Sequence, residues 1–381
     1  MDFSFSDEQT TIRDLARGIL EKEVTADRVK QVEEQPQWFD EALWSTLAEA
    51  GLLGLAVEPE LGGMGYGLGE VVVLLEELGR VVAPAPALAT MVLGGLPVAE
   101  FGTDAQKQEW LTPMAAGEAV LTAGLIDAEP ASDGTPGTRA SKDGSSWVIN
   151  GRKLLVPAAH LAARCLVPAA TDAGVGIFLV DPEVAGVTLT RNRTSTGEPV
   201  FSVDLDGVRV EEPGLLGGEV ASGGEGLERV EWIHDRALVA TCAMQLGVCE
   251  RALEMTAAYV TEREQFGVPI GTFQAVQHRS ADAYIDLNAM RWTMWRAAWR
   301  LAQGRPASRD AAMAKFWAAE GGARITTSAQ HLHGGMGVDV DYPIHRYLLW
   351  SKALELSLGG AMPQLVRLGQ DMARATPQET A

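Results

Sequence analysis

Residues 259–278 read YVTEREQFGVPIGTFQAVQH, and this stretch decides how the fold is interpreted. A helical run ends in a charged and aromatic cluster, a turn containing Gly and Pro follows, and a second helical run starts at Gln274. As a structural element the stretch is a helix–helix corner with solvated charges. As a functional element it is an anion site, because Arg263 can donate two parallel hydrogen bonds to a pyrophosphate and Phe266 can pack on a flat ring. The residues alone leave both interpretations open.

Outward from this corner, the C-terminal part predicts long helices. Few helix breakers interrupt residues 227–259, 281–301, 310–331 and 342–356. Helices of about 30 residues span about 45 Å, a length that suits a bundle with partner-facing surfaces. A stripe of Trp292, Trp295 and Trp299 at helical spacing predicts core or interface packing.

The first third also predicts helices, and the middle predicts strands. Ser6 with Gln9, and Thr103 with Gln106, form capping boxes that open two helices. Apolar residues at helical spacing predict further helices near residues 43–52 and 68–80. Residues 120–216 are short β-type runs, in which Asn150-Gly151 predicts a tight turn. The expected α+β fold has a helical domain (1–119), an antiparallel β-barrel or sandwich (120–216) and a helical bundle (217–381).

The charge balance excludes several classes of protein. The 381 residues hold 31 Lys and Arg against 51 Asp and Glu, for a net charge of −20. Nucleic-acid binders and polybasic membrane-surface proteins need clustered positive charge, so neither class fits. The apolar run 71–96 is broken by charges and prolines, so we expect no membrane span. The absence of signal-peptide features and the three isolated cysteines, Cys165, Cys242 and Cys249, predict a cytoplasmic protein with inert thiols.

Other local motifs carry little chemistry. Three Gly clusters, at residues 62–67, 223–226 and 334–337, lack the strand and the βαβ unit of a dinucleotide fingerprint. His331 and His333 have no carboxylate or Cys at ligand spacing, so no metal site is expected. No GxSxG nucleophile motif is present.

The chain resembles the acyl-CoA dehydrogenase family. The block from Arg263 to Gln274 is similar to the family's Arg-x-Gln-Phe-Gly signature, and residues 331–337 (HLHGGMG) are similar to its C-terminal Gly-Gly motif. Residues 147–153 (WVINGRK) are similar to the family's Trp-x-x-x-Gly-x-Lys turn. The order of helices, strands and helices agrees along essentially the whole chain.

The resemblance implies a flavoprotein oxidoreductase that dehydrogenates an acyl-CoA thioester between its α- and β-carbons. It implies FAD, a tetramer built from two dimers, and an external electron-transfer acceptor. Each FAD is shared, so that one subunit reaches the pyrophosphate and adenosine of its neighbour's cofactor. The residues implied for that contact are Arg263, Gln265, Phe266, Phe273, Gln274, His331, Gly334 and Gly335.

The residues implied for the chain's own flavin ring depart from the family pattern. The usual Asn-Gly-x-Lys-x-Trp-Ile-Thr reads NGRKLLVP at residues 150–157, so Leu155 replaces the aromatic ring. Pro157 replaces the Thr, and it offers neither a hydroxyl nor an N–H group. The usual Ala-Gly-Ser-Asp run appears as Glu129-Pro130-Ala131-Ser132-Asp133, without the Gly.

The positions of the catalytic base are also changed. Counting without gaps from the matched motifs, the two positions at which family members carry the basic Glu hold Ala237 and Leu358. Neither side chain can take a proton. Glu355 is the remaining candidate, since it shares the face of Leu358 if the helix continues to that residue. A helix-end carboxylate with no catalytic part is its alternative role.

Two principal hypotheses follow. In the first, the chain is the subunit without a base in a heteromeric acyl-CoA dehydrogenase, similar to the α2β2 enzymes of actinobacterial steroid side-chain degradation. In the second, it is a self-sufficient homo-oligomeric acyl-CoA dehydrogenase with Glu355 as a relocated base. A non-enzymatic protein of the same fold, binding CoA esters or partner chains, is a third. The acyl group is not readable from the residues.

Overall fold

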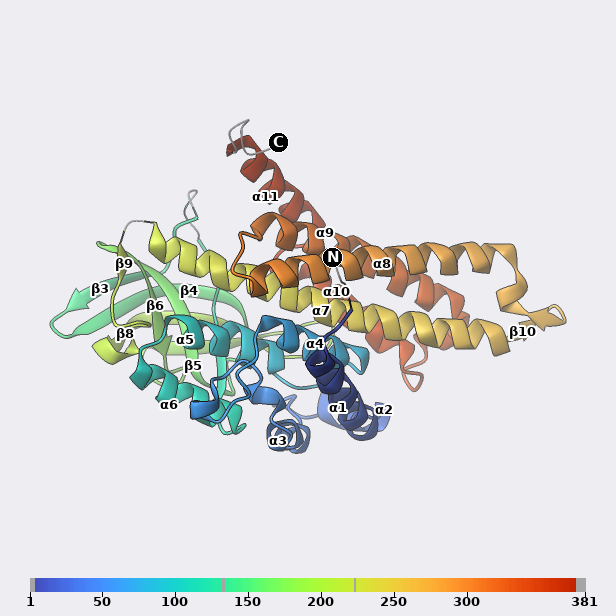
Figure 1. Cartoon of the computed structure of the whole chain (residues 1–381), viewed down its shortest axis with the longest axis horizontal. Helices are drawn as coiled ribbons and strands as arrows, with labels where there is room; N and C mark the ends of the chain where they lie inside the picture. Colours follow the sequence, from blue (N-terminus) through green and yellow to red (C-terminus); the bar gives the residue numbers. More distant parts are fainter. Residues whose placement is uncertain (1–3, 130, 132–133, 223, 375–381) are drawn as a thin grey trace. The chain divides into compact units, whose positions relative to one another are not determined.

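The computed structural model describes residues 4–129, 131, 134–222 and 224–374 (Figure 1). The N-terminal part is helical, as the capping boxes predicted. Both boxes are formed, with the Ser6 and Thr103 hydroxyls accepting from the N–H groups of Gln9 and Gln106. The helices of this part are α1 (Asp7–Glu23), α2 (Ala26–Glu33), α3 (Glu41–Glu49), α4 (Leu68–Arg80), η3 (Leu88–Gly95, a π-helix), α5 (Leu96–Phe101) and α6 (Asp104–Ala115), with 3-10 turns η1 (Leu52–Gly54) and η2 (Pro59–Leu61).

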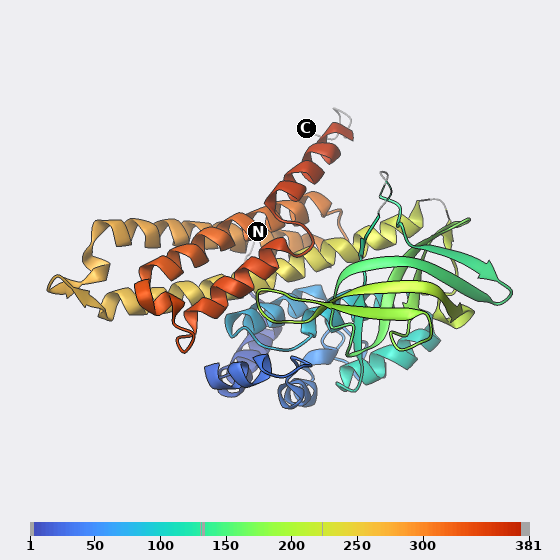
Figure 2. The same ribbon diagram turned by 180° about the vertical axis from the view of Figure 1, so that it is seen from behind.

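The middle of the chain forms one curled, mostly antiparallel sheet, seen from behind in Figure 2. Its path is β7-β8-β4-β3-β5-β6-β9, with β1 joined to β5 and β2 to β4. Trp147, Phe178 and Val203 fill the core on the inner face of the sheet. The strands are β1 (Val120–Ala123), β2 (Ile126–Asp127), β3 (Arg139–Asp143), β4 (Ser146–Pro157), β5 (Ala162–Thr171), β6 (Gly174–Val180), β7 (Val187–Asn192), β8 (Val200–Glu211) and β9 (Ala221–Ser222), with the turn η4 (Glu212–Gly214).

Long helices make up the C-terminal part, as predicted from its scarcity of breakers. They are α7 (Glu225–Glu262), α8 (Gln274–Ala302), α9 (Ser308–Leu332), α10 (Ile344–Leu356) and α11 (Ala361–Arg374), with a small hairpin β10 (Glu264–Gln265) and β11 (Val268–Pro269) and the turns η5 (Ile270–Thr272) and η6 (Gly334–Val338). None of the helices in the described part of the chain is long and apolar enough to cross a bilayer.

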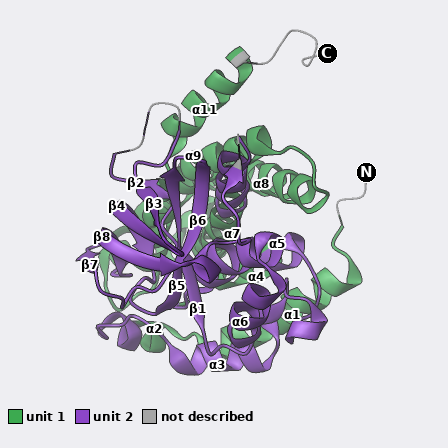
Figure 3. Ribbon diagram, turned by 90° about the vertical axis from the view of Figure 1, so that its left-hand side faces the viewer, with its two compact units in different colours: residues 1–29, 72–83, 238–381 green, residues 30–71, 84–237 purple. Residues whose placement is uncertain are grey.

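Two compact units divide the chain (Figure 3). Unit 1 comprises Met1–Val29, Val72–Ala83 and Leu238–Ala381, and unit 2 comprises Lys30–Val71 and Pro84–Ala237. Glycines allow close helix packing in unit 1. A Cβ on Gly247 of α7 would lie 1.9 Å from the carbonyl oxygen of Glu76 on α4, and one on Gly322 of α9 would lie 1.9 Å from Nε2 of Gln245 on α7. The domain boundaries at 119/120 and 216/217 stay a prediction.

One turn prediction is wrong. Asn150 and Gly151 lie inside β4, where the pairing with β8 shifts register between Ile149 and Gly151. The strand continues because the Asn150 side chain accepts a hydrogen bond from the Gly207 N–H at 2.8 Å across the ladder. Gly151 has φ 150°, and a Cβ there would meet Thr138 Oγ1 at 2.7 Å. The Gly is therefore required by a β-bulge and a close strand crossing rather than by a hairpin turn.

Candidate functional site

The corner between α7 and α8 carries most of the residues expected to contact a cofactor. The β10–β11 hairpin lies at the far end of these two helices in both Figures 1 and 2. Its ladder pairs Glu264 with Pro269 and Gln265 with Val268, so Phe266 and Gly267 form a two-residue turn. Both turn residues have positive φ, 56° and 80°. This is the geometry of a type I′ turn, and the Gly at its second position suits it.

The aromatic side chains of this corner face solvent. The Phe266 side chain is 93% exposed and the Phe273 side chain is 37% exposed. Their rings contact each other edge to face, with centroids 6.2 Å apart. An aromatic ring held in a strained turn and left in water gains nothing for the folding of its own chain. The two rings together form an exposed apolar surface at the tip of the hairpin and the start of α8.

The start of α8 provides hydrogen-bond donors beside these rings. Phe273 is the N-cap, and its side chain makes no capping hydrogen bond. Its carbonyl oxygen accepts from the N–H groups of Val276 and Gln277. The N–H groups at the beginning of a 29-residue helix, together with the positive end of the helix dipole, favour a phosphate. Arg263 and Gln265 are also exposed, so their side chains are accessible to such an anion.

A stack of aromatic rings connects this corner with the second predicted group, His331 to Gly335. The ring of Tyr259, one turn before Arg263, stacks on buried His333 at 4.4 Å. His333 Nδ1 donates to the Ala329 carbonyl at 2.8 Å, and its Nε2 lies 3.4 Å from the hydroxyl of Tyr342. Burial lowers the pKa of His333, which keeps the ring neutral at pH 7. Sequence reasoning assigned no role to Tyr259, although it stands inside the decisive stretch.

The glycines of the second group leave open space. Gly334 has φ 57°, and a Cβ added at Gly334 or Gly335 would meet nothing within 4 Å. His331 is exposed, whereas its neighbour His333 is buried. Because these glycines fill no crowded site in this chain, the space above them is available to a ligand or to another subunit.

The donor set fits the pyrophosphate and adenosine half of FAD. A guanidinium, a side-chain amide and a free helix N-terminus are suitable partners for a doubly charged pyrophosphate. Two exposed phenyl rings offer a packing surface for a flat base. All eight predicted residues belong to unit 1 and lie in the segment 263–274, in the last turn of α9 (His331) or in the turn η6 that follows it (Gly334 and Gly335).

The residues of unit 2 expected near a flavin ring fit that ring poorly. Leu155 lies at a second bulge of β4, with φ 52° and a side chain that is 52% exposed. The carbonyl oxygen of Pro157 accepts from Thr122 Oγ1 at 2.7 Å, and the proline has no N–H to offer. Neither position supplies an aromatic face or a donor for a flavin. Pro130, Ser132 and Asp133 of the altered Ala-Gly-Ser-Asp run lie outside the described residues.

Lys153 of β4, which matches the Lys of the family's β-domain turn, has a structural partner. Lys153 is fully buried, and its Nζ donates to Asp127 Oδ2 at 2.7 Å. Asp127 Oδ1 also accepts from the N–H and the hydroxyl of Thr138, at 2.9 and 2.6 Å. Burial lowers the pKa of Lys153, and the Asp127 carboxylate opposes that effect. Lys153 thus joins β4 to β2 instead of reaching a ligand.

Neither expected base position holds a proton acceptor. Ala237 is fully buried in α7. Leu358 has φ 55° and follows the end of α10, where the Leu358 and Gly359 carbonyls accept from the Gln364 amide at 3.2 Å. The helix ends at Leu356, so the condition under which Glu355 shares the face of Leu358 is not met.

Glu355 is already engaged. Its carboxylate accepts from Lys352 Nζ at 2.5 Å, and its side chain is 20% exposed. Buried Lys315 donates to the carbonyl oxygens of Leu354 and Glu355 at 2.5 and 3.0 Å, which places a positive charge at the C-terminal end of α10. This arrangement holds the helix end and the loop after it.

Comparison with known proteins gives matches along the chain. The family model described as "Acyl-CoA dehydrogenase, N-terminal domain" matches residues 6–118, and that described as "Acyl-CoA dehydrogenase, C-terminal domain" matches residues 224–365. Acyl-CoA dehydrogenase FadE27 of Mycobacterium tuberculosis is 37% identical over 384 residues, covering 98% of this chain and 99% of the relative.

Two solved structures are similar in sequence and fold. A variant of the steroid ACAD Tcur3481-Tcur3483 is 43% identical with a TM-score of 0.88, covering 96% of this chain and 98% of the other. The ChsE4-ChsE5 complex from Mycobacterium tuberculosis is 37% identical with a TM-score of 0.92, covering 99% of this chain and 100% of the other. The predicted order of helical, β and helical parts is confirmed by the structure and by these matches.

Proposed function

The chain belongs to the acyl-CoA dehydrogenase family, a family of flavin oxidoreductases, and we propose that it is the subunit without a base in a heteromeric enzyme of that family. It contributes contacts to FAD across a subunit interface. A partner chain of the same fold provides the carboxylate that removes the α-proton of an acyl-CoA thioester.

The observation that carries this proposal is a one-sided change of residues. The groups suited to a neighbour's cofactor are present and exposed, with Phe266 93% exposed at the tip of a strained turn. The groups suited to the chain's own flavin and base are replaced by Leu155, Pro157, Ala237 and Leu358. A subunit that assists a neighbouring active site needs the first set and can lose the second.

The comparisons support the heteromeric assembly and a class of substrate. Two similar structures, Tcur3481-Tcur3483 and ChsE4-ChsE5, are named for two chains each, and the first is called a steroid ACAD. We therefore assign to this chain a partner of acyl-CoA dehydrogenase fold and a substrate whose acyl group is a steroid side chain. The electron acceptor is an external electron-transfer protein, and the assembly is cytoplasmic and tetrameric.

The reaction needs an acceptor for the hydride and an acceptor for the α-proton. When bound, FAD supplies the acceptor for the hydride that leaves the substrate β-carbon. Arg263 and the start of α8 would hold the pyrophosphate, Phe266 and Phe273 would pack on the adenosine half, and Gly334 and Gly335 would leave room for it. The α-proton goes to a carboxylate of the partner chain, since both base positions of this chain are apolar.

Arg263→Ala tests the proposal in the complex with a candidate partner encoded beside this chain. Losing one side of a charged hydrogen-bonded contact costs on the order of 2–5 kcal/mol, so FAD affinity should fall at least about thirtyfold. Arg279→Ala is the matched control, because it removes the same charge from an exposed position of α8. Flavin absorbance per complex and circular dichroism are the measurements. Equal flavin content in the Arg263→Ala and Arg279→Ala complexes would mean that the corner between α7 and α8 has only a structural role.

Purification of the chain alone distinguishes the two hypotheses on assembly. In the heteromeric hypothesis the chain alone holds little FAD and has no dehydrogenase activity. FAD binding and activity appear when the partner chain is present. A homo-oligomer that binds one FAD per chain and turns over acyl-CoA would contradict the proposal and favour Glu355 as the base.

A further inference from the structure

A pocket of about 410 Å³ lies wholly within unit 1, away from the α7–α8 corner. Its walls come from α1, the start of α2, the end of α4, the middle of α7 and the start of α10. None of the eight residues assigned to FAD and none of the base positions lines it. The volume suits a small organic molecule.

Four arginines line this pocket, from four different helices: Arg17, Arg80, Arg251 and Arg346. The lining also includes two carboxylates, Glu21 and Glu77. The formal charge of the lining is therefore 4 − 2 = +2, in a chain whose net charge is −20. Guanidinium groups outnumber carboxylates in this lining, and their N–H donors favour an anion.

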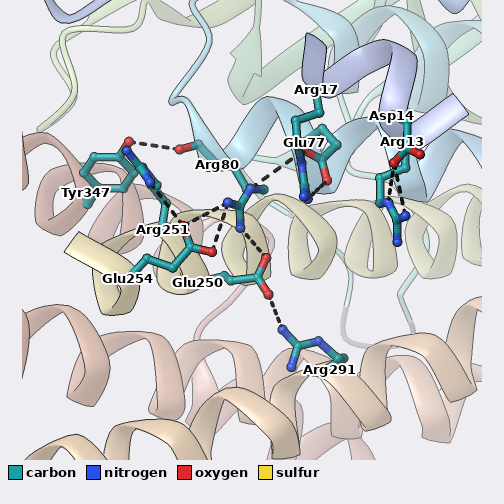
Figure 4. Close-up of polar contacts among 10 residues, drawn as sticks. All are labelled: Arg13, Asp14, Arg17, Glu77, Arg80, Glu250, Arg251, Glu254, Arg291 and Tyr347. Carbon is teal, nitrogen blue, oxygen red and sulfur yellow. Dashed lines mark hydrogen bonds and ion pairs between the residues drawn. The ribbon is translucent and has the colours of Figure 1, made fainter. Parts of the chain in front are cut away.

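A network of ion pairs holds two of these arginines in place (Figure 4). Arg17 donates to both oxygens of Glu77, at 2.9 and 2.6 Å. Arg80 contacts Glu250 at 2.5 Å and both oxygens of Glu254, at 3.0 and 2.9 Å. The side chains of Glu77 and Arg80 are only 4% and 9% exposed, so the floor of the pocket is rigid and charged before any ligand arrives.

Arg251 is the arginine of this set that remains more accessible. It pairs with Glu254 at 3.2 Å through Nη1, and its side chain is 47% exposed. In Figure 4 it lies beside Tyr347, whose hydroxyl donates to the Arg80 carbonyl at 2.9 Å. A guanidinium has five N–H donors, so the contact with Glu254 leaves donors of Arg251 for a ligand.

Two helix N-termini reach the same pocket. Pro343, the N-cap of the 13-residue helix α10, lines it, and so do Thr25 and Ala26 at the start of α2. Their positive dipole ends add to the charge of the arginines. Aliphatic side chains, among them Leu20 and Met255, form the rest of the wall. The surroundings therefore combine charge recognition with an apolar surface.

We propose that this pocket binds a small organic phosphate, a phosphate monoester with a compact apolar body. Arg17, Arg80 and Arg251 already pair with Glu77, Glu250 and Glu254, so a ligand would bind through their remaining N–H donors, and a phosphate offers these donors three oxygens where a carboxylate offers two. A phosphate monoester is close to a dianion at pH 7. Guanidinium groups bind its oxygens in pairs, and the aliphatic wall accepts the ester group. The pocket shares no lining residue with the proposed FAD contact.

Calorimetric titration of the purified oligomer with phenyl phosphate, inorganic phosphate and benzoate tests this proposal. Phenyl phosphate should bind saturably and more tightly than either of the others, since it alone combines the dianion with the ring. Arg251→Gln should weaken its binding about tenfold to a hundredfold, the effect of losing a hydrogen bond to a charged group. Ala26→Phe, at an exposed position of the lining, should block the pocket while keeping every charge.

Arg13→Gln is the matched control. Arg13 lies on α1 one turn from Arg17, pairs with Asp14 at 3.1 Å and does not line the pocket. The control should leave phenyl phosphate affinity within about twofold, because Arg13 does not line the pocket and its charge is paired with Asp14. Three results would overturn the proposal: no saturable binding of phenyl phosphate, an equal loss in Arg13→Gln and Arg251→Gln, or unchanged affinity in Ala26→Phe.

Discussion

Replacing Phe266 tests whether its ring contributes to folding of the chain or to binding of the cofactor. The residue has φ 56° and a side chain that is 93% exposed. A left-handed conformation costs a residue with a Cβ about 1–2 kcal/mol, less for Asn. Because the ring is in water, its removal takes little apolar contact from the chain. Phe266→Asn should therefore unfold in urea with a free energy at least equal to that of the wild type, and about 0.5–1 kcal/mol above that of Phe266→Ala.

The same replacement should weaken FAD binding in the assembled enzyme. Burying about 150 Å² of a phenyl ring at 25 cal/mol per Å² contributes up to about 4 kcal/mol, so the affinity loss should reach two to three powers of ten. Phe266→Tyr keeps the ring and should retain most of the affinity. Flavin retention after gel filtration measures each variant.

Two outcomes would refute this reasoning. If Phe266→Asn lowers the free energy of unfolding by several kcal/mol, the ring contributes to the fold of the chain. If FAD affinity is unchanged in Phe266→Ala, the hairpin tip contacts no cofactor.

Three further perturbations test other parts of the structure. Glu355→Gln should leave turnover of the assembled enzyme within a few-fold of wild type, whereas loss of a general base would cost 10²–10⁴, as steady-state kinetics would show. Burial, with a smaller contribution from Glu250, raises the pKa of Glu76 to about 8, so the folded state binds the extra proton between pH 4.5 and 8. The free energy of unfolding falls as pH rises through this window. In Glu76→Gln, the difference in this free energy between pH 5 and pH 8, measured by urea unfolding, should be about 3 kcal/mol smaller than in the wild type. Lys153→Met should lower the free energy of unfolding by about 3–5 kcal/mol, since it leaves the Asp127 carboxylate buried without its cation, and Asp127→Asn in the same chain should recover part of the loss.

Features that depend on neighbouring residues along the chain were predictable from the sequence. Capping boxes and the spacing of apolar side chains were sufficient for α1, α6 and the 13 residues of α4, because these signals act within one or two turns. The sequence also showed that the two expected base positions hold no base, since a Leu or an Ala cannot accept a proton wherever it lies. The stretch 259–278 indicated the corner between α7 and α8 and the residues that a cofactor could contact.

Features that depend on residues far apart in the chain became visible only in the folded structure. Asn150-Gly151 reads locally as a hairpin turn, yet pairing with β8 keeps it in a strand, because the ladder and the hydrogen bond to Gly207 outweigh the local preference. Glu355 could not be excluded from the face of Leu358 until α10 was seen to end at Leu356. The arginine pocket has no signature in the sequence, since Arg80 and Glu254 are 174 residues apart and meet only when α4 packs against α7.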